Sequence, residues 1–347
     1  MSGPEIRIDQ LTGLRTVLAP ARADRPNAFV VDRRPLPDPE GCPFCEGNEQ
    51  ETPGEVWAAR PQGGEPNSGG WAQRAVPNLY PAFSGEAAED AGGRDSGISA
   101  SADPLRSSAR SREPDLFSSR PAAGAQEVIV HTPRHVTALA QLEAAELEGA
   151  LGAWRTRMRA HPGAALVQLI VNEGPGAGAS REHTHAQLYA LPFVPAAVAR
   201  ERERVTAYRE RTAGADLLGD VLTEEVRREE RLVAIDDDAA LVCPWASRSP
   251  FELRVIPRRD APRFEQGSSG TAMLGTAMRV LAARFGEPPE LNLWVRTAPQ
   301  GAEHFRWHID IAPKLTVHAG FEMATGVDIN IMPPERAAEE LRETLDG

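Results

Sequence analysis

The chain has 347 residues, enough for one large domain or two ordinary ones. Hydrophobic residues make up 41% of the sequence and charged residues 25%, as is usual for globular proteins. The formal net charge of -12 argues against a general nucleic-acid-binding surface, although a few clustered arginines can still hold a small phosphorylated ligand.

No stretch approaches the roughly eighteen consecutive apolar residues of a membrane span, and the first residues contain no apolar signal core. We therefore expect a cytoplasmic protein without a membrane partner. Three cysteines are too few for a disulfide framework in a chain of this length, and two of them, Cys42 and Cys45, are separated by only two residues. Metal binding is the better interpretation of that pair.

In chain order, residues 5–31 have the character of an edge strand followed by a turn. The turn contains Arg22 and Arg25. Solvation is the usual explanation for two arginines in a turn, and contact with phosphate oxygens is the alternative. These two arginines alone do not establish a phosphate-binding site.

Cys42 and Cys45 follow in a turn rich in glycine and proline, from Gly41 to Glu49. Their spacing suits two thiolates on one metal, and it also occurs in thioredoxin-like redox pairs. A redox pair should open a helix, whereas here glycine, asparagine and proline continue the loop. We therefore predict a zinc knuckle that takes two more ligands from elsewhere in the chain.

Residues 84–124 contain hardly any large apolar side chain, and this composition predicts a mobile loop. A buried strand is expected at 126–131, and a helix at about 137–160 because apolar residues recur there at helical spacing. A further strand is expected at 165–171. It leads through a glycine-rich loop into the segment that carries the chemistry.

In that segment His183, His185 and Gln187 alternate with small residues. Alternate side chains on a β-strand share one face, roughly 6 to 7 Å apart. A solvent-facing strand with incidental histidines is the alternative explanation. Three polar groups on one face of an otherwise apolar strand favour a functional site.

The second half of the chain repeats the first in outline. His183 stands 48 positions after His135, and His308 stands 49 positions after Arg259. The order of strand, helix and strand between them is also repeated, which indicates an internal duplication. Only the first copy has a complete set of chemically active side chains.

The first copy supplies two thiolates and two imidazoles, a normal tetrahedral zinc set: Cys42, Cys45, His135 and His183. Four protein ligands leave no open position, so the metal should be structural. His185 remains free, and a neutral imidazole is a competent nucleophile toward phosphorus at pH 7. Gln187, Ser180 and backbone N–H groups between Gly174 and Gly178 are candidates to hydrogen-bond the phosphoryl oxygens.

Several motifs, in this order, resemble the galactose-1-phosphate uridylyltransferase family of the histidine-triad superfamily. They are Arg22-x-x-Arg25-Pro26, the Cys42/Cys45 knuckle, Val76-Pro77-Asn78, Pro133-Arg134-His135, His183-Thr184-His185-Ala186-Gln187, Pro244-Trp245-Ala246 and Gly320-Phe321-Glu322-Met323. The loop from Glu46 to Pro53 is more similar to the subgroup that includes ADP-glucose phosphorylase.

The resemblance implies an α+β fold made of two tandem histidine-triad-like domains, each a mainly antiparallel sheet with packed helices. We place these domains at 1–195 and 196–347 and expect a homodimer. The resemblance also implies zinc on the four ligands named above, His185 as the nucleotidylated nucleophile and Gln187 as its partner. Residues expected to bind substrate are Arg22, Arg25, Asn78, Asn172, Ser180 and Gln187.

Some family members hold a second metal in the C-terminal half through a glutamate and three histidines. Glu201 and His308 match that pattern, but Arg296 and Asp310 stand where two of the histidines are expected. We therefore expect no second metal here.

The partners implied are a nucleotide sugar and a sugar phosphate, with no nucleic acid. The default reaction moves uridine monophosphate between UDP-glucose and galactose 1-phosphate through a histidine-bound intermediate. The enzymatic alternative is phosphorolysis or hydrolysis of ADP-glucose or of a dinucleoside polyphosphate. A zinc-stabilised nucleotide-binding protein without turnover is the non-enzymatic alternative.

Overall fold

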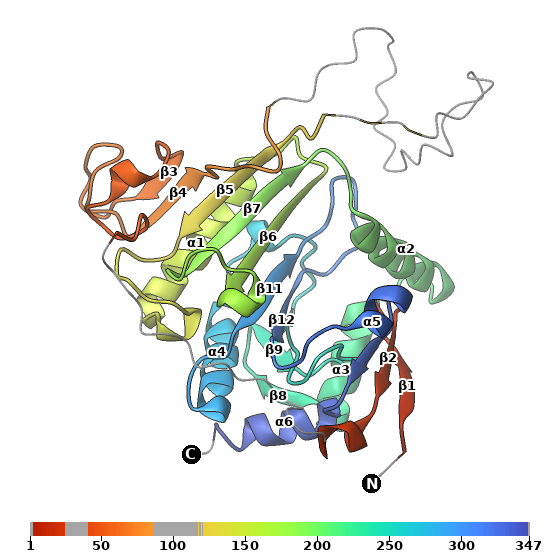
Figure 1. Cartoon of the computed structure of the whole chain (residues 1–347). Coiled ribbons are helices and arrows are strands. Elements are labelled where there is room, and N and C mark those ends of the chain that lie inside the picture. The colour runs from red at the N-terminus through yellow and green to blue at the C-terminus, as the bar shows by residue number, and fades with distance from the viewer. Residues whose placement is uncertain (1–2, 25–40, 86–116, 118, 120, 346–347) are drawn as a thin grey trace, which may run out of the picture.

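The computed structural model describes residues 3–24, 41–85, 117, 119 and 121–345. A twisted antiparallel sheet runs through this part of the chain (Figure 1). Its ten strands lie in the order β3 (Trp57–Ala59), β4 (Gln73–Pro77), β5 (Ala125–Val130), β7 (His185–Leu191), β6 (Leu166–Glu173), β11 (Leu291–Arg296), β12 (His308–Pro313), β10 (Leu253–Pro257), β9 (Ala239–Val242) and β8 (Leu232–Ile235). The α+β class expected from the sequence is confirmed.

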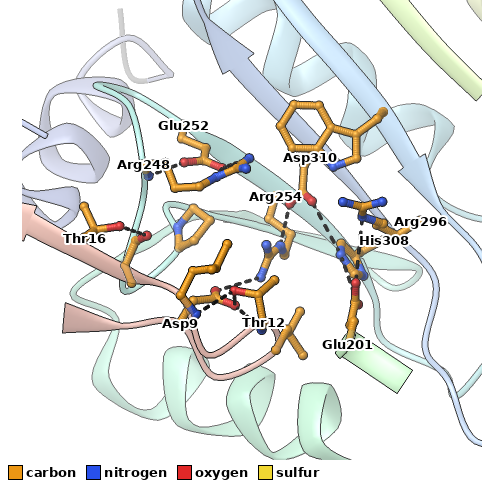
Figure 2. A pocket seen from close by; sticks show the side chains of 15 residues that line it. Asp9, Thr12, Thr16, Glu201, Arg248, Glu252, Arg254, Arg296, His308 and Asp310 are labelled. Atoms are coloured by element: carbon orange, nitrogen blue, oxygen red, sulfur yellow. Dashed lines mark hydrogen bonds and ion pairs between the residues drawn. The ribbon is translucent and has the colours of Figure 1, made fainter. Parts of the chain in front are cut away.

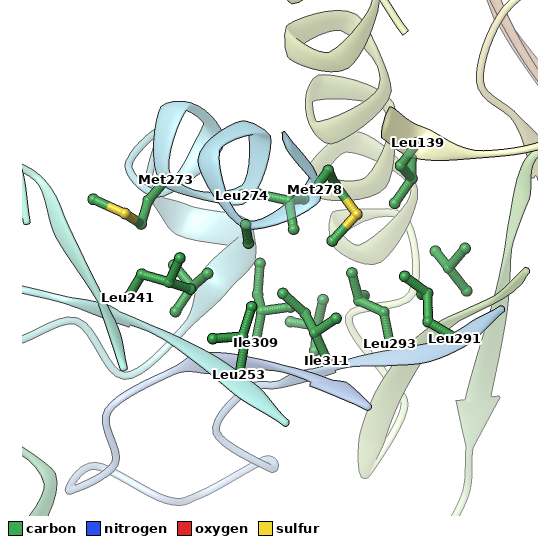
Figure 3. Close-up of a cluster of buried hydrophobic side chains, with 14 of the residues drawn as sticks. Leu139, Leu241, Leu253, Met273, Leu274, Met278, Leu291, Leu293, Ile309 and Ile311 are labelled. Carbon is green, nitrogen blue, oxygen red and sulfur yellow. The ribbon is translucent and has the colours of Figure 1, made fainter. Parts of the chain in front are cut away.

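One face of this sheet is covered by α1 (Ala144–Arg159) and α4 (Thr271–Phe285). Figure 3 shows aliphatic and methionine side chains of α4 packed over leucines and isoleucines of β9 to β12. This single core extends under both halves of the sheet, and burial of its apolar area is the main stabilising term of the fold.

On the opposite face, the turn that carries Phe44 packs with Trp71 over β4 and β5, and helices cover the C-terminal strands. There α2 (Ala196–Arg211) and α3 (Leu217–Arg228) pack against β9 and β10. A small sheet of β1 (Glu5–Ile8), β2 (Arg15–Leu18) and β13 (Asp328–Asn330), with α5 (Gly320–Thr325) and α6 (Pro334–Arg342), completes that end of the molecule (Figure 1).

Strand alternation separates the core from the polar face of the sheet. In β7, Ala186 and Leu188 belong to the buried core, so His185 and Gln187 point to the opposite face. In β11, the core residues Leu291, Leu293 and Val295 leave the even-numbered side chains on that same opposite face. The polar face therefore carries the side chains that the sequence singled out.

The helix expected at 137–160 begins at Ala144, because residues 139–141 form a 3-10 turn and the backbone N–H of Glu143 donates to the Glu146 carboxylate at 2.9 Å. Most of the segment 84–124, for which a mobile loop was expected, lies outside the described residues. In the described part of the chain, no helix is long and apolar enough to cross a membrane.

Candidate functional site

Four side chains from separate parts of the chain converge on one point. The cysteines come from the turn before β3, His135 from the loop after β5, and His183 from the residues just before β7. Their ligand atoms all lie within 4.8 Å of one another. The structure therefore brings Cys42, Cys45, His135 and His183 together as expected.

Both imidazoles face the sulfur atoms through Nδ1. Cys45 Sγ lies 3.3 Å from His135 Nδ1, while the two sulfurs lie 3.6 and 3.7 Å from His183 Nδ1. Tetrahedral zinc bonds of about 2.3 Å to sulfur and 2.0 Å to nitrogen put such atoms roughly 3.6 Å apart. His183 Nε2 donates to the carbonyl oxygen of Thr132 at 2.9 Å, which leaves Nδ1 unprotonated for a metal. The donor set fits a four-coordinate metal.

Electrostatics distinguish the two kinds of ligand. Burial raises the pKa of the Cys45 thiol to about 12, and the neighbouring Cys42 adds to this shift. Burial lowers the pKa of His183 to about 4, so its imidazole is already neutral at pH 7. A bound cation reverses the preference of the thiols and holds them as thiolates.

His185 is the first residue of β7 and is only 4% exposed. Its Nδ1 donates to the carbonyl oxygen of His183 at 2.8 Å, so Nε2 carries the free lone pair. Burial lowers the pKa of this imidazole, which keeps it neutral. The ring of Phe44, from between the two cysteines, packs against it with centroids 5.2 Å apart. The nucleophile candidate is thus fixed by the same turn that supplies the thiols.

Gln187 follows on the same face, and two residues that sequence reasoning missed orient its amide. Its oxygen accepts hydrogen bonds from Gln126 Nε2 at 3.2 Å and from the Tyr189 hydroxyl at 2.8 Å. Within the described part of the chain, the NH2 group is therefore the end of the amide available to a phosphoryl oxygen. Tyr189 could have been found from the sequence, because it stands two positions after Gln187 on the same strand. Gln126 could not, because its contact with Gln187 depends on the register of β5 against β7.

The glycine-rich loop between β6 and β7 uses some of its backbone N–H groups for bonds within the loop. Gly174 and Gly178 have φ of +87° and +84°, which allows a tight 3-10 turn between them. The N–H groups of Ala177 and Gly178 donate to carbonyl oxygens within this loop, and Pro175 has no N–H. The expectation that this run of amides holds phosphoryl oxygens is wrong for these three residues.

Asn172 lies at the end of β6, where the second half of the chain contacts the loop. Its side-chain oxygen accepts a hydrogen bond from Asn292 Nδ2 at 2.9 Å, and the same NH2 group donates to the carbonyl oxygen of Ala177 at 2.8 Å. Asn292, on β11, was missed from the sequence. Through it, the C-terminal half holds the loop that leads into β7.

The other candidates are distributed unevenly. The backbone N–H of Asn78 donates to the carbonyl oxygen of Gln126, which places it near Gln187. Ser180 is exposed between the loop and His183. Arg22 lies in a 3-10 helix after β2, and β2 and β13 lie at the opposite end of the molecule from β3 and β4 (Figure 1). Arg25 lies outside the described residues.

Residues 80–195 match the family model described as galactose-1-phosphate uridyl transferase, N-terminal domain. The resemblance to that family is confirmed. ADP-glucose phosphorylase of Arabidopsis thaliana is 29% identical over 98% of this chain and 93% of its own length. Galactose-1-phosphate uridylyltransferase of Thermotoga maritima is 27% identical over 67% of this chain and 78% of its own.

Among solved structures, the Arabidopsis thaliana ADP-glucose phosphorylase with bound ADP-glucose has a TM-score of 0.75 and 25% identity, covering 98% of this chain and 99% of that one. A uridylyltransferase structure has a TM-score of 0.71 at 22% identity, covering 99% of this chain and 98% of that one, and shows the fold alone. The comparisons thus extend beyond the matched N-terminal region to nearly the whole chain.

The residues at which a second metal was considered form ion pairs with one another. Figure 2 shows Glu201, Arg254, Arg296, His308 and Asp310 pointing toward one another. Arg254 Nε lies 2.6 Å from Asp310, and His308 Nε2 lies 3.5 Å from Asp310 and 3.7 Å from Glu201. Burial opposes ionisation of Asp310, but Arg254 and His308 outweigh it and lower its pKa well below the usual range. Two guanidinium groups already supply positive charge, so this donor set does not fit a metal.

We expect Glu201→Gln to leave the metal content of the protein unchanged. The reason is that Glu201 pairs with His308 and Arg296 and not with an ion. Elemental analysis of the purified variant beside the unchanged chain measures this directly. A fall of one metal equivalent would show that Glu201 is a metal ligand after all.

Proposed function

We propose that the chain transfers a nucleoside monophosphate from a nucleotide sugar to a phosphate-bearing acceptor through a covalent bond to His185. The observation that carries the proposal is the fixed tautomer of this imidazole: its Nδ1–H is bonded to the His183 carbonyl, and Nε2 keeps its lone pair in a buried, neutral ring. A nucleophile of this kind divides one difficult transfer into two easier ones.

In the first step Nε2 of His185 attacks the phosphorus bound to the nucleoside. A nitrogen–phosphorus bond forms, the bond to the bridging oxygen breaks, and hexose 1-phosphate leaves with the electron pair. In the second step a phosphate oxygen of the acceptor attacks the same phosphorus, and the imidazole leaves. The Nδ1–H stays on the ring throughout, donating to the carbonyl of His183.

Gln187 acts in this proposal through its NH2 group, which donates to a phosphoryl oxygen as charge develops. We expect Gln187→Ala to slow nucleotide labelling of the protein by about 2 to 4 kcal/mol of barrier, the usual loss for one oxyanion donor. Tyr189→Phe removes one of the two donors on the Gln187 oxygen, so it should slow labelling less. Rapid-quench measurement of the labelling rate compares Gln187→Ala, Tyr189→Phe and the unchanged chain. Equal rates in all three would exclude a role for the Gln187 amide.

We further propose that Cys42, Cys45, His135 and His183 bind one structural zinc ion. The ion would supply no reaction step; bound there, it would fix the turn of Phe44 and the residues leading into β7. Arg22, Arg25, Asn78, Asn172 and Ser180 remain our proposed substrate ligands. The bond from the Asn78 backbone N–H to Gln126, whose side chain contacts Gln187, supports Asn78.

For the donor we favour ADP-glucose, with inorganic phosphate as the acceptor, because the Arabidopsis thaliana ADP-glucose phosphorylase is 29% identical over 98% of this chain, whereas a Neurospora crassa uridylyltransferase is 24% identical over 97%. UDP-glucose with galactose 1-phosphate is the second candidate, supported by alignments to uridylyltransferases at 24 to 27% identity. A product assay with both donors, each with phosphate, galactose 1-phosphate or no acceptor, decides between them. We expect ADP and glucose 1-phosphate from ADP-glucose and phosphate; turnover only with galactose 1-phosphate would favour uridylyl transfer.

Two tandem histidine-triad-like domains, 1–195 and 196–347, remain our proposal for the organisation of the chain, with a homodimer as its assembly. The sheet order supports the tandem arrangement: β4-β5-β7-β6 is followed by β11-β12-β10-β9, which repeats the same pattern of neighbours in reverse across the β6–β11 pair. Asn172 and Asn292 face each other in that pair.

A further inference from the structure

A buried row of polar side chains lies behind the nucleophile strand, on the face of the sheet that α1 covers. Trp154 Nε1 lies 3.0 Å from His131 Nε2, and His131 Nδ1 lies 3.1 Å from Thr184 Oγ1. Thr184 Oγ1 lies 3.3 Å from Glu173 Oε1, which also accepts from the backbone N–H of Leu139 at 2.5 Å. All five residues are at most 2% exposed.

The proton positions in this row follow from donor chemistry alone. An indole N–H can only donate, so His131 Nε2 must be the unprotonated nitrogen. The proton of a neutral His131 then sits on Nδ1 and points at Thr184 Oγ1. With its oxygen accepting that bond, the Thr184 hydroxyl donates its own proton to Glu173. Every bond therefore runs in one direction, from α1 through the end of β5 to the end of β6.

Thr184 connects this row to the site, because it stands between the metal-ligand candidate His183 and the nucleophile candidate His185. The next residue after His131 is Thr132, whose carbonyl accepts from His183 Nε2. The consecutive residues His131 and Thr132, just after β5, therefore hold Thr184 and His183, just before β7. The backbone N–H of Thr184 is also bound, to the carbonyl oxygen of Val136 at 2.8 Å.

We propose that Trp154, His131, Thr184 and Glu173 form a positioning relay that fixes the backbone before His185 and so aligns its Nε2 for attack. The proposal rests on the function proposed above. None of the four residues touches the reacting atoms, so each acts through another. A displacement of about 1 Å at a reacting group can cost roughly 100-fold in rate, so a relay of this kind should affect the chemical step more than binding.

The direct test of the relay is the tautomer of His131, read by nitrogen-15 NMR of the imidazole in the unchanged, metal-loaded chain. We expect the proton on Nδ1 only. A proton on Nε2 would overturn the relay by itself, whether or not the protein labels.

The functional test compares Thr184→Val, which removes the hydroxyl but keeps the branched shape, with Thr184→Ser, which keeps the hydroxyl. At saturating nucleotide sugar and without acceptor, we expect Thr184→Val to slow labelling at least about tenfold. Its donor affinity and metal content should be unchanged. Thr184→Ser should keep most of the rate. Equal labelling rates in Thr184→Val and the unchanged chain would contradict the positioning role. So would an equal loss of labelling rate in Thr184→Val and Thr184→Ser.

Trp154→Phe tests the far end of the relay if Thr184→Val fails to fold, since it keeps an aromatic ring and lies on α1, away from the metal ligands. It should populate the Nε2–H tautomer of His131 and slow labelling, as Thr184→Val does. An unchanged tautomer and rate in this variant would overturn the relay. If the unchanged chain never labels, the proposed function fails and the positioning role fails with it, whereas a wrong tautomer removes the relay alone.

Discussion

His185→Asn is expected to abolish nucleotide labelling of the protein and to reduce turnover by roughly 10⁴- to 10⁶-fold, the usual loss when a covalent nucleophile is removed. Asparagine has a similar size and polarity, but its amide nitrogen carries no lone pair free to attack phosphorus. Base-labelled ADP-glucose and UDP-glucose, each mixed with the protein without acceptor and then denatured, measure the bound label. Full-rate turnover by this variant would leave direct transfer between two bound substrates as the mechanism.

His183→Asn is the matched control, because it lies two residues away and approaches both sulfur atoms. We expect this variant to lose metal, whereas His185→Asn should retain it. Elemental analysis of both proteins separates the two roles. The opposite pair of results would exchange the assignments of nucleophile and ligand.

Replacing Cys42 and Cys45 together by serine is expected to remove the bound zinc and to destabilise the N-terminal half of the chain. Structural zinc sites in small peptides contribute about 10 to 16 kcal/mol of apparent binding free energy, and that free energy is coupled to folding. We expect faster hydrogen exchange in the turn around Phe44 and at the entrance to β7. Metal analysis and hydrogen exchange on the same sample check both parts.

Cys243→Ser provides the control for that double variant. Cys243 is fully buried among core residues and stands apart from the four-ligand group. It should change stability through packing without changing the metal content. Unchanged metal content in a folded Cys42→Ser, Cys45→Ser protein would show that the zinc site has been assigned to the wrong residues.

Residues close in sequence were the easier part of the site to predict. The spacing of the two cysteines and the alternation of His183, His185 and Gln187 are local patterns, and the structure brings the cysteines and His183 together with His135. The α+β class was implied by the family resemblance, and the strands and helices expected from local patterns agree with it. The start of α1 was misjudged by several residues because Glu143 and Glu146 cap it within an apolar pattern that begins earlier.

What the sequence did not reveal depends on strand register. Gln126 reaches Gln187 only because β5 pairs with β7 in one register, and Asn292 reaches Asn172 only because β11 pairs with β6. A shift of one residue would turn these side chains to the other face. The same limit applies to Arg22, whose position follows from the parallel pairing of β2 with β13 near the other end of the chain.

The most direct test of the covalent mechanism is the mass of the intact chain after it is mixed with ADP-glucose or UDP-glucose in the absence of acceptor. We predict an increase equal to one nucleoside monophosphate less one water molecule, located on His185 after digestion and removed by added acceptor. The bond should be acid-labile, because protonation of the phosphoramidate makes imidazole a good leaving group. An unchanged mass under conditions where the same preparation turns over would contradict the mechanism.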